Sequence, residues 1–223
     1  EDTGPTSFNR VGKTKLGTVG PIIPGCEVKI ADDGEILVKG PNVFLGYYKE
    51  PEATAETLKD GWLCSGDLGA IDAEGFLSIT GRKKEIIITS GGKNITPSEI
   101  ENQLKFSPYI SDAVVIGDKR AYLTCLVMIE RETVEKYAQD LDVPFTNYAS
   151  LCRSKEVQDL IWSEIEKVNA NFARVETIKR FFLIEQQLTP EDEELTPTMK
   201  LKRSFVNKKY KNEIDAMYRP QAA

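Results

Sequence analysis

Basic side chains and a pair of glycines surround one short apolar run of this chain. In the stretch GRKKEIIITSGGKNITPSEIE, Arg82 and Lys84 come before the run, and Gly91, Gly92 and Lys93 follow it. Adjacent glycines let the backbone approach a ligand closely and expose N–H donors, which suits a phosphate-bearing or pantetheine-like ligand. The alternative is structural, because a solvated hairpin tip with a flexible polar loop has the same composition.

A carboxylate and a guanidinium are spaced so that they could border one site. Asp67 lies between glycine-bearing turns in GWLCSGDLG, and a carboxylate on a tight turn can accept two hydrogen bonds from a vicinal diol such as that of a ribose. Arg82 ends the next expected strand, so in a meander the two side chains lie on neighbouring strand ends. The alternatives are a turn cap for Asp67 and a surface ion pair worth less than about 1 kcal/mol.

A lysine near the end of the chain is a third candidate. In LTPTMKLKRSF, Lys200 lies between the acidic residues 191–194 and a predicted helix. There it could bring positive charge to a phosphate in a transition state, or it could be a solvated side chain. Basic neighbours also raise the possibility of nucleic-acid binding, but the acidic stretch and the net charge of −6 argue against it. These neighbours are Lys202, Arg203, Lys208 and Lys209.

The residue types that are absent or scattered restrict the chemistry. The 223 residues include no histidine, so they cannot form Ser-His-Asp or Cys-His machinery or a His-ligated metal site. The four cysteines are far apart without a C-x-x-C pair, which indicates reduced thiols of a cytosolic protein rather than a zinc site or a disulfide framework. No apolar run reaches the roughly 18 residues that span a bilayer. Any reaction here must use carboxylates, lysines, arginines and backbone amides.

The residues up to about 80 are predicted to be rich in β-strands. A hairpin joins strands Glu27–Ile30 and Glu35–Lys39 through a turn at residues 32–34. A second hairpin has its turn at residues 72–75 and a return strand beginning at Phe76. Between the hairpins, PEATAETLKDGW predicts one or two helical turns.

After Arg82 the pattern changes to alternating strands and helices. Glu85–Thr89 is predicted as a strand, and a helix begins at Thr96, with Pro97 at its first position and Glu99 closing a capping box. Two strands follow around a turn at residues 117–120, then an amphipathic helix, the strand IKRFFLIE and a final helix, SFVNKKYKNEIDAMY. The amphipathic helix carries apolar residues at helical spacing: Val157, Ile161, Ile165, Val168 and Phe172.

The fold class is therefore α+β, with a boundary near Arg82–Glu85. The expected domains are a β-rich part at residues 1–82 and an α+β domain, a sheet flanked by helices, at residues 83–223.

Four motifs in a fixed order resemble one family. They are residues 34–54, 61–69, 81–101 and 197–203, and they resemble successive motifs of the adenylate-forming enzymes, which include acyl-CoA synthetases, luciferases and peptide-synthetase adenylation domains. The resemblance covers nearly the whole chain. TSGGK and PTMKLKR look most like the long-chain fatty acyl-CoA synthetases of the bubblegum-like branch, although most other relatives have Gly-Lys where this chain has Met199 before Lys200.

The resemblance implies a role for each candidate residue. Asp67 would bind the ribose hydroxyls of ATP or AMP with Arg82 beside it, and Lys200 would stabilise charge on the α-phosphate and the carboxylate during adenylation. Lys84 matches the hinge about which a mobile lid domain, residues 83–223, rotates against the large adenylation domain. Glu1 matches the last residue of a motif associated with Mg2+.

The second half-reaction is implied for the glycine loop. Rotation would bring Gly91, Gly92 and Lys93 to the site for transfer of the acyl group to CoA. The substrates implied are a fatty acid, ATP and CoA. The family's phosphate loop and acyl pocket would lie upstream of Glu1, so the chain alone is expected to show no fatty-acid-dependent exchange between ATP and pyrophosphate.

Three alternatives stay open. The chain could belong to a ligase for another carboxylic acid, to an acyl-AMP ligase that delivers to a carrier protein, or, in a different class, to a binding module without catalysis. The sequence predicts a cytoplasmic protein that binds no nucleic acid, and a fatty-acid substrate suggests peripheral association with a membrane surface. It indicates no oligomeric state.

Overall fold

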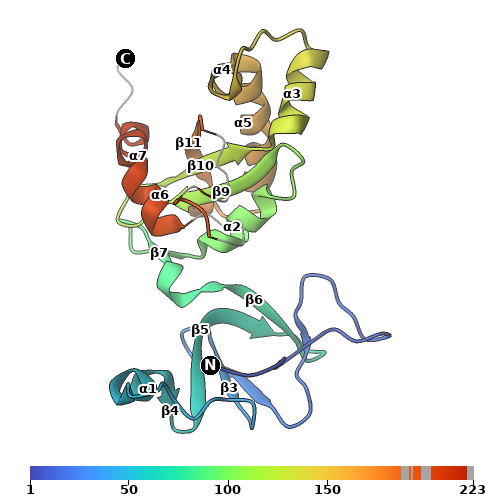
Figure 1. Ribbon diagram of the computed structural model, residues 1–223, viewed down its shortest axis with the longest axis vertical. Coiled ribbons are helices and arrows are strands. Elements are labelled where there is room, and N and C mark those ends of the chain that lie inside the picture. The colour runs from blue at the N-terminus through green and yellow to red at the C-terminus, as the bar shows by residue number, and fades with distance from the viewer. Residues whose placement is uncertain (187–190, 192, 197–201, 220–223) are drawn as a thin grey trace. The chain divides into compact units, whose positions relative to one another are not determined.

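The computed structural model describes residues 1–186, 191, 193–196 and 202–219 of the chain (Figure 1). The chain divides into two compact units, Glu1–Ile86 and Ile87–Ala223. Among the described residues, no helix has both the length and the apolar composition needed to cross a bilayer.

The first unit is built on an antiparallel sheet with the strand order β1-β6-β5-β3-β2, and β4 pairs with β5. Its elements are β1 (Gly20–Pro21), β2 (Glu27–Ile30), β3 (Glu35–Lys39), α1 (Pro51–Thr57), β4 (Leu58–Lys59), β5 (Trp62–Ile71) and β6 (Phe76–Arg82), followed by a 3-10 turn, Lys83–Glu85. The core of this sheet contains Ile36, Val38, Leu63 and Leu77.

Both predicted hairpins are confirmed in this unit. Strands β2 and β3 pair from Glu27 opposite Lys39 to Ile30 opposite Ile36. In the second hairpin, one carboxylate oxygen of Asp72 accepts the N–H groups of Glu74 and Phe76, so the turn side chain organises the reversal.

The second unit contains a three-stranded sheet and most of the helices. Its elements are β7 (Ile87–Ile88), β8 (Asn94–Ile95), α2 (Pro97–Leu104), β9 (Ile110–Ile116), β10 (Leu123–Ile129), α3 (Arg131–Asp140), α4 (Tyr148–Arg153), α5 (Lys155–Asn169), a 3-10 turn (Arg174–Glu176), β11 (Ile178–Leu183), α6 (Arg203–Lys209) and α7 (Lys211–Met217). The sheet has the order β11-β10-β9, in which β10 is parallel to β11 and antiparallel to β9. The predicted α+β class is confirmed.

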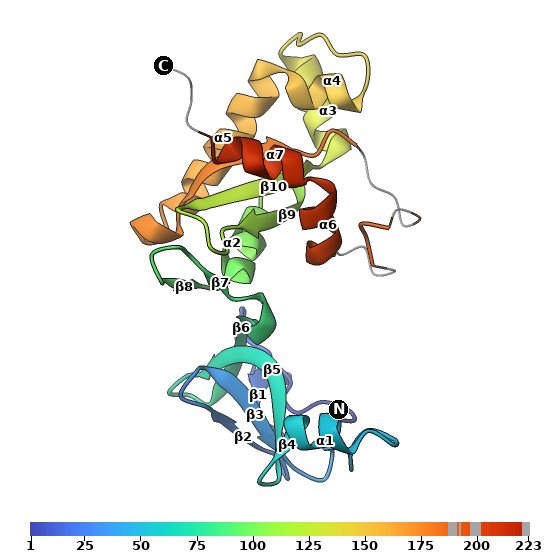
Figure 2. The ribbon, with the colours of Figure 1, turned by 90° about the vertical axis from the view of Figure 1, so that its left-hand side faces the viewer.

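Helices cover both faces of this sheet because its side chains alternate between two apolar cores. In β9, Ala113 and Val115 belong to the core formed with α2, α3, α4 and α5, whereas Val114 and Ile116 belong to the core formed with α6 and α7. Figures 1 and 2 show α6 and α7 on the side of the sheet opposite to α2 and α5. A strand buried on both faces reads as a continuous apolar run, as DAVVIG does.

The predicted strand Glu85–Thr89 is largely wrong. Its first residue belongs to the 3-10 turn Lys83–Glu85, and only Ile87 and Ile88 form a strand, which pairs with β8. The strand ends there because the chain turns at Thr89, whose carbonyl accepts the Gly92 N–H at 2.9 Å.

The predicted capping box at the start of α2 is also wrong. Thr96 is the N-cap residue and Pro97 takes the first helical position, but the Thr96 side chain makes no capping hydrogen bond. The backbone carbonyl of Thr96 accepts the Glu99 N–H at 3.4 Å.

The helical predictions near the end of the chain need two changes. The final helix is two helices, because Tyr210 leaves helical geometry at φ −96° and ψ 25°. Phe172 packs on the predicted core but lies beyond the end of α5. The helix ends at Asn169, whose side chain hydrogen-bonds both the N–H and the carbonyl of Ile178.

Candidate functional site

The structure brings Asp67 and Arg82 together on adjacent strands of the first unit. Asp67 in β5 lies directly opposite Arg82 in β6, and the Arg82 Nε lies 2.7 Å from the Asp67 Oδ1. The Arg82 side chain is 64% exposed and that of Asp67 25% exposed. The predicted carboxylate and guanidinium therefore form one ion pair, open to solvent on the arginine side. Arg82 is at the end of β6 as predicted, but the prediction of a strand end for Asp67 is wrong, because β5 continues through Asp67 to Ile71.

The backbone before Asp67 is held in an unusual geometry. Gly66 has φ +72°, which glycine adopts without the steric cost of a side chain. The Ser65 hydroxyl accepts the Asp67 N–H at 3.0 Å and donates to the Ile36 carbonyl at 2.7 Å. The irregular stretch of β5 just before Asp67 is thus fixed to β3 by a side chain rather than by regular strand pairing.

Electrostatics around Asp67 oppose its charge more than they support it. Burial raises the pKa of the Asp67 carboxyl, and the nearby carboxylates of Asp2, Glu1 and Glu85 act in the same direction, while the Arg82 charge opposes them. A carboxylate that has lost part of its hydration gains more from new hydrogen-bond donors than an exposed one. The ion pair is made through the Asp67 Oδ1, and a quarter of the Asp67 side chain is exposed.

A pocket of about 370 Å³ lies next to this pair within the first unit. Its lining includes Glu1, Tyr47, Arg82 and Lys84. The Tyr47 hydroxyl donates to the Glu1 Oε1 at 2.5 Å. Glu1, predicted as a Mg2+-associated residue, therefore shares a cavity with the arginine of the ion pair.

A preformed cage of protein ligands for a metal is not present in the part of the chain that the structure describes. No group of three or more His, Cys, Asp or Glu side chains there could hold an ion. Mg2+ is commonly bound by one or two carboxylates together with phosphate oxygens and water. The Glu1 carboxylate fits that lesser role.

Lys84 lies at the end of the first unit. It is an exposed residue in the 3-10 turn Lys83–Glu85, two residues before Ile86, the last residue of the first unit. Arg82 is the last residue of β6, so the chain passes directly from the ion pair into this turn.

The glycine loop lies in the second unit, between β7 and β8. The Gly92 N–H donates to the Thr89 carbonyl at 2.9 Å, and the Thr89 N–H donates to the Lys93 carbonyl at 3.1 Å. Gly91, Gly92 and Lys93 are exposed, and Gly92 has φ +77°. A Cβ at Gly92 would meet nothing within 4 Å, so the glycine serves the turn and leaves open space beside the backbone.

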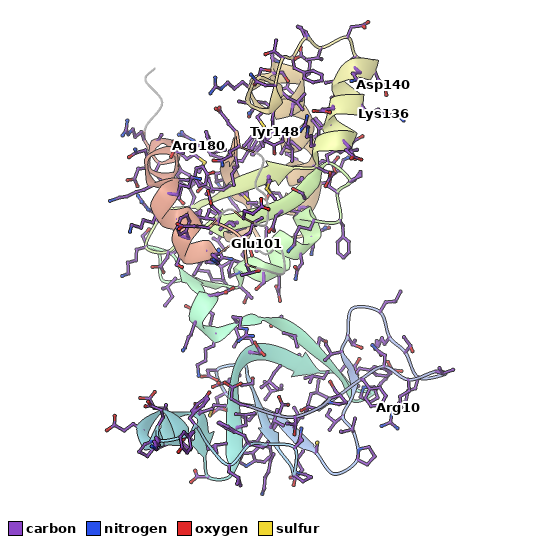
Figure 3. All side chains as sticks on the ribbon, in the orientation of Figure 1. Arg10, Glu101, Lys136, Asp140, Tyr148 and Arg180 are labelled. Carbon is purple, nitrogen blue, oxygen red and sulfur yellow. The ribbon has the colours of Figure 1, made fainter. Side chains whose placement is uncertain are left out.

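Lys200 lies outside the described residues. The described chain resumes at Lys202, whose N–H donates to the Glu194 carbonyl at 2.7 Å. Arg203 begins α6 and forms an ion pair with Glu101 of α2 at 2.6 Å; Figure 3 labels Glu101.

Sequence reasoning missed that three carboxylates of the described residues are buried: Glu35, Glu101 and Glu194, which are 7%, 8% and 3% exposed. A signal existed for Glu101, because it follows Ile100 and precedes Leu104 by three positions on the buried face of α2. Glu35 begins a hairpin strand, where a charged residue is ordinary, and the sequence offered no comparable signal.

Comparisons with known proteins agree with the resemblance seen in the motifs. Residues 84–222 match the family described as AMP-binding enzyme C-terminal domain. The chain is 41% identical over 98% of its length to the long-chain-fatty-acid–CoA ligase FadD15 of Mycobacterium bovis, and 36% identical over 99% to ACSBG1 of Mus musculus, also a long-chain-fatty-acid–CoA ligase.

The fold of the chain is also similar to that of a solved structure. The ATP-bound RpMatB-BxBclM chimera B1 is 27% identical, with a TM-score of 0.68 over 93% of this chain and 39% of that one. The chain spans 36% of the length of FadD15 and 34% of that of ACSBG1. Since the family match covers more than half of its residues, the chain belongs to the AMP-binding, adenylate-forming enzymes and carries their C-terminal domain.

Proposed function

We propose that the protein that carries this chain is an AMP-forming, ATP-dependent long-chain fatty acid–CoA ligase. In the first step the fatty-acid carboxylate attacks the α-phosphorus of ATP, releasing pyrophosphate and forming an acyl-adenylate. In the second, the CoA thiolate attacks the acyl carbonyl and AMP leaves. The observation that carries the proposal is the 41% identity to a long-chain-fatty-acid–CoA ligase over 98% of the chain.

Asp67 and Arg82 are proposed to bind the nucleotide. The ribose hydroxyls would donate to the Asp67 carboxylate, a charge-assisted contact worth about 1.5–3 kcal/mol. The ion pair supports this role, because the Arg82 charge favours the ionised form of Asp67 and offsets part of the rise in its pKa that burial causes. Glu1, in the neighbouring pocket, would hold Mg2+ together with phosphate oxygens. The ion supplies neutralisation of phosphate charge.

Lys200 is proposed to stabilise the charge that develops on the α-phosphate and the carboxylate during adenylation. The support is its place in PTMKLKR, in order after the other three motifs. The lysine acts as a positioned cation and takes no part in covalent chemistry.

Lys84 is proposed as a hinge, and the loop of Gly91, Gly92 and Lys93 as a contact for CoA in the second step. The division of the chain between Ile86 and Ile87, two residues beyond Lys84, supports the hinge. A domain that turns about a few residues can present different groups to one centre in succession.

Exchange between ATP and pyrophosphate tests the proposal in the full-length protein. The wild type is expected to show exchange that depends on a long-chain fatty acid, and Lys200→Ala is expected to lose about 100-fold in adenylation. Release of acyl-CoA from supplied acyl-adenylate should fall much less. The control Lys155→Ala, at an exposed position in α5, should match the wild type.

Each alternative predicts a different result from these assays. Exchange with another acid but not with fatty acids would contradict the substrate, and transfer to a holo carrier protein in place of CoA would contradict the acceptor. A full-length protein without exchange for any acid would support a binding module and overturn the proposal.

A further inference from the structure

Glu35 is a buried carboxylate to which the proposed reaction assigns no role. It is the first residue of β3 and is 7% exposed. Buried carboxylates are uncommon unless their oxygens are paired. Both oxygens of Glu35 have partners, and each partner is the chain neighbour of a residue in the Asp67–Arg82 ion pair.

The first partner lies beside Asp67. The Gly66 N–H donates to the Glu35 Oε1 at 3.0 Å. Glu35 pairs with Leu68 and Leu37 pairs with Cys64, so one residue of β3 faces three residues of β5. The hydrogen-bond ladder between β3 and β5 is interrupted at this bulge. The Glu35 carboxylate therefore accepts the Gly66 N–H in place of a backbone carbonyl of β3. Bulges of this kind change the direction of the side chains they carry.

The second partner lies beside Arg82. The Lys83 Nζ donates to the Glu35 Oε2 at 2.7 Å and lies 2.6 Å from the Asp33 Oδ2. Asp33 in turn accepts the Glu35 N–H at 3.2 Å. The two carboxylates raise the pKa of the Lys83 amine, and that amine is the largest cause of the lowered pKa of Asp33. Lys83 therefore stays charged and held at neutral pH.

We propose that Glu35 is a positioning residue that sets the geometry of Asp67 and Arg82 by holding Gly66 with one oxygen and Lys83 with the other. The inference rests on the proposed nucleotide-binding role of that ion pair. Glu35 also lines the pocket beside the ion pair, and in the proposed role it acts through its two partners. The two contacts are separable, because an amide at this position keeps an acceptor for Gly66 but loses the charge that Lys83 requires.

The test uses the full-length enzyme and compares ATP with 2′,3′-dideoxy-ATP in fatty-acid-dependent adenylation. The wild type is expected to prefer ATP by about 100-fold in kcat/KM. Glu35→Ala is expected to reduce that preference by about 10-fold, chiefly through the KM for ATP, and Glu35→Gln by less. Partial unfolding would lower kcat/KM for both nucleotides equally, so the preference separates positioning from a loss of folded enzyme.

Glu27→Ala is the matched control, since Glu27 is an exposed glutamate at the start of the neighbouring strand β2. It should keep the wild-type preference. A wild-type enzyme that shows no fatty-acid-dependent adenylation would contradict the proposed function. An active wild type that prefers ATP, with Glu35→Ala keeping the whole preference, would overturn the role of Glu35 alone.

Discussion

Each unit of the chain contains a carboxylate paired with an arginine. The two pairs have similar distances between their charged atoms, but they differ in exposure and in their other hydrogen bonds. Asp67 and Arg82 lie 2.7 Å apart in the first unit, and Glu101 and Arg203 lie 2.6 Å apart in the second. The Arg82 side chain is 64% exposed, whereas that of Arg203 is 23% exposed. Exposure decides what each pair can do.

The pair in the second unit is closed by further hydrogen bonds. The Glu101 Oε1 accepts from the Arg203 guanidinium and from the Val115 N–H at 2.7 Å, and Arg203 also donates to the Val115 carbonyl at 2.8 Å. These contacts join α2, β9 and α6. Burial raises the pKa of Glu101, and Arg203 and the Val115 N–H offset part of that effect. We call Glu101–Arg203 the closed pair, because its hydrogen bonds to the backbone give it a structural role. Asp67–Arg82 is the open pair, because the exposed Arg82 side chain can still contact a ligand.

The largest expected effect is on the stability of the second unit. Glu101→Gln leaves the charge of Arg203 partly buried and unpaired, which is expected to cost about 3 kcal/mol in the free energy of unfolding. Urea unfolding followed by Trp162 fluorescence, in a Trp62→Phe background, reports on this unit because Trp162 belongs to α5. Lys155→Gln, at the exposed pair with Asp159, should leave the midpoint unchanged. A urea midpoint for Glu101→Gln equal to that of the wild type would contradict the structural role of the Glu101–Arg203 pair.

A smaller effect on stability is expected in the first unit. Arg82→Gln breaks an exposed ion pair and should change the free energy of unfolding by less than about 1 kcal/mol. Fluorescence of Trp62 in β5, in a Trp162→Phe background, follows this unit. The same variant of the full-length enzyme should nevertheless raise the KM for ATP by about 10-fold. Equal destabilisation by Arg82→Gln and Glu101→Gln would remove the distinction between the two pairs.

The open pair was partly predictable because a hairpin turn fixes the register of its strands. The turn after Ile71 places that residue opposite Leu77, and a regular ladder counted back from there would put Asp67 opposite Gly81. A register shift between Leu68 and Gly69 puts it opposite Arg82. The sequence predicted neighbouring strands, but it wrongly placed Asp67 at a strand end and did not predict the register shift.

The closed pair could not be predicted, because its partners come from segments about a hundred residues apart. Nothing local to Glu101 or Arg203 indicates that α6 packs beside α2. The break at Tyr210 is similar, since the local sequence favours one continuous helix. Tyr210 packs beside Phe182 of β11, with ring centroids 6.5 Å apart, and this tertiary contact is invisible in the helical spacing.

The most direct test of the central claim is the position of the ribose in a crystal structure of the full-length protein with bound AMP. The account predicts at least one ribose hydroxyl oxygen within about 3.2 Å of an Asp67 carboxylate oxygen, with Arg82 still paired to the other. A ribose bound elsewhere, with Asp67 contacting only Arg82, would contradict it.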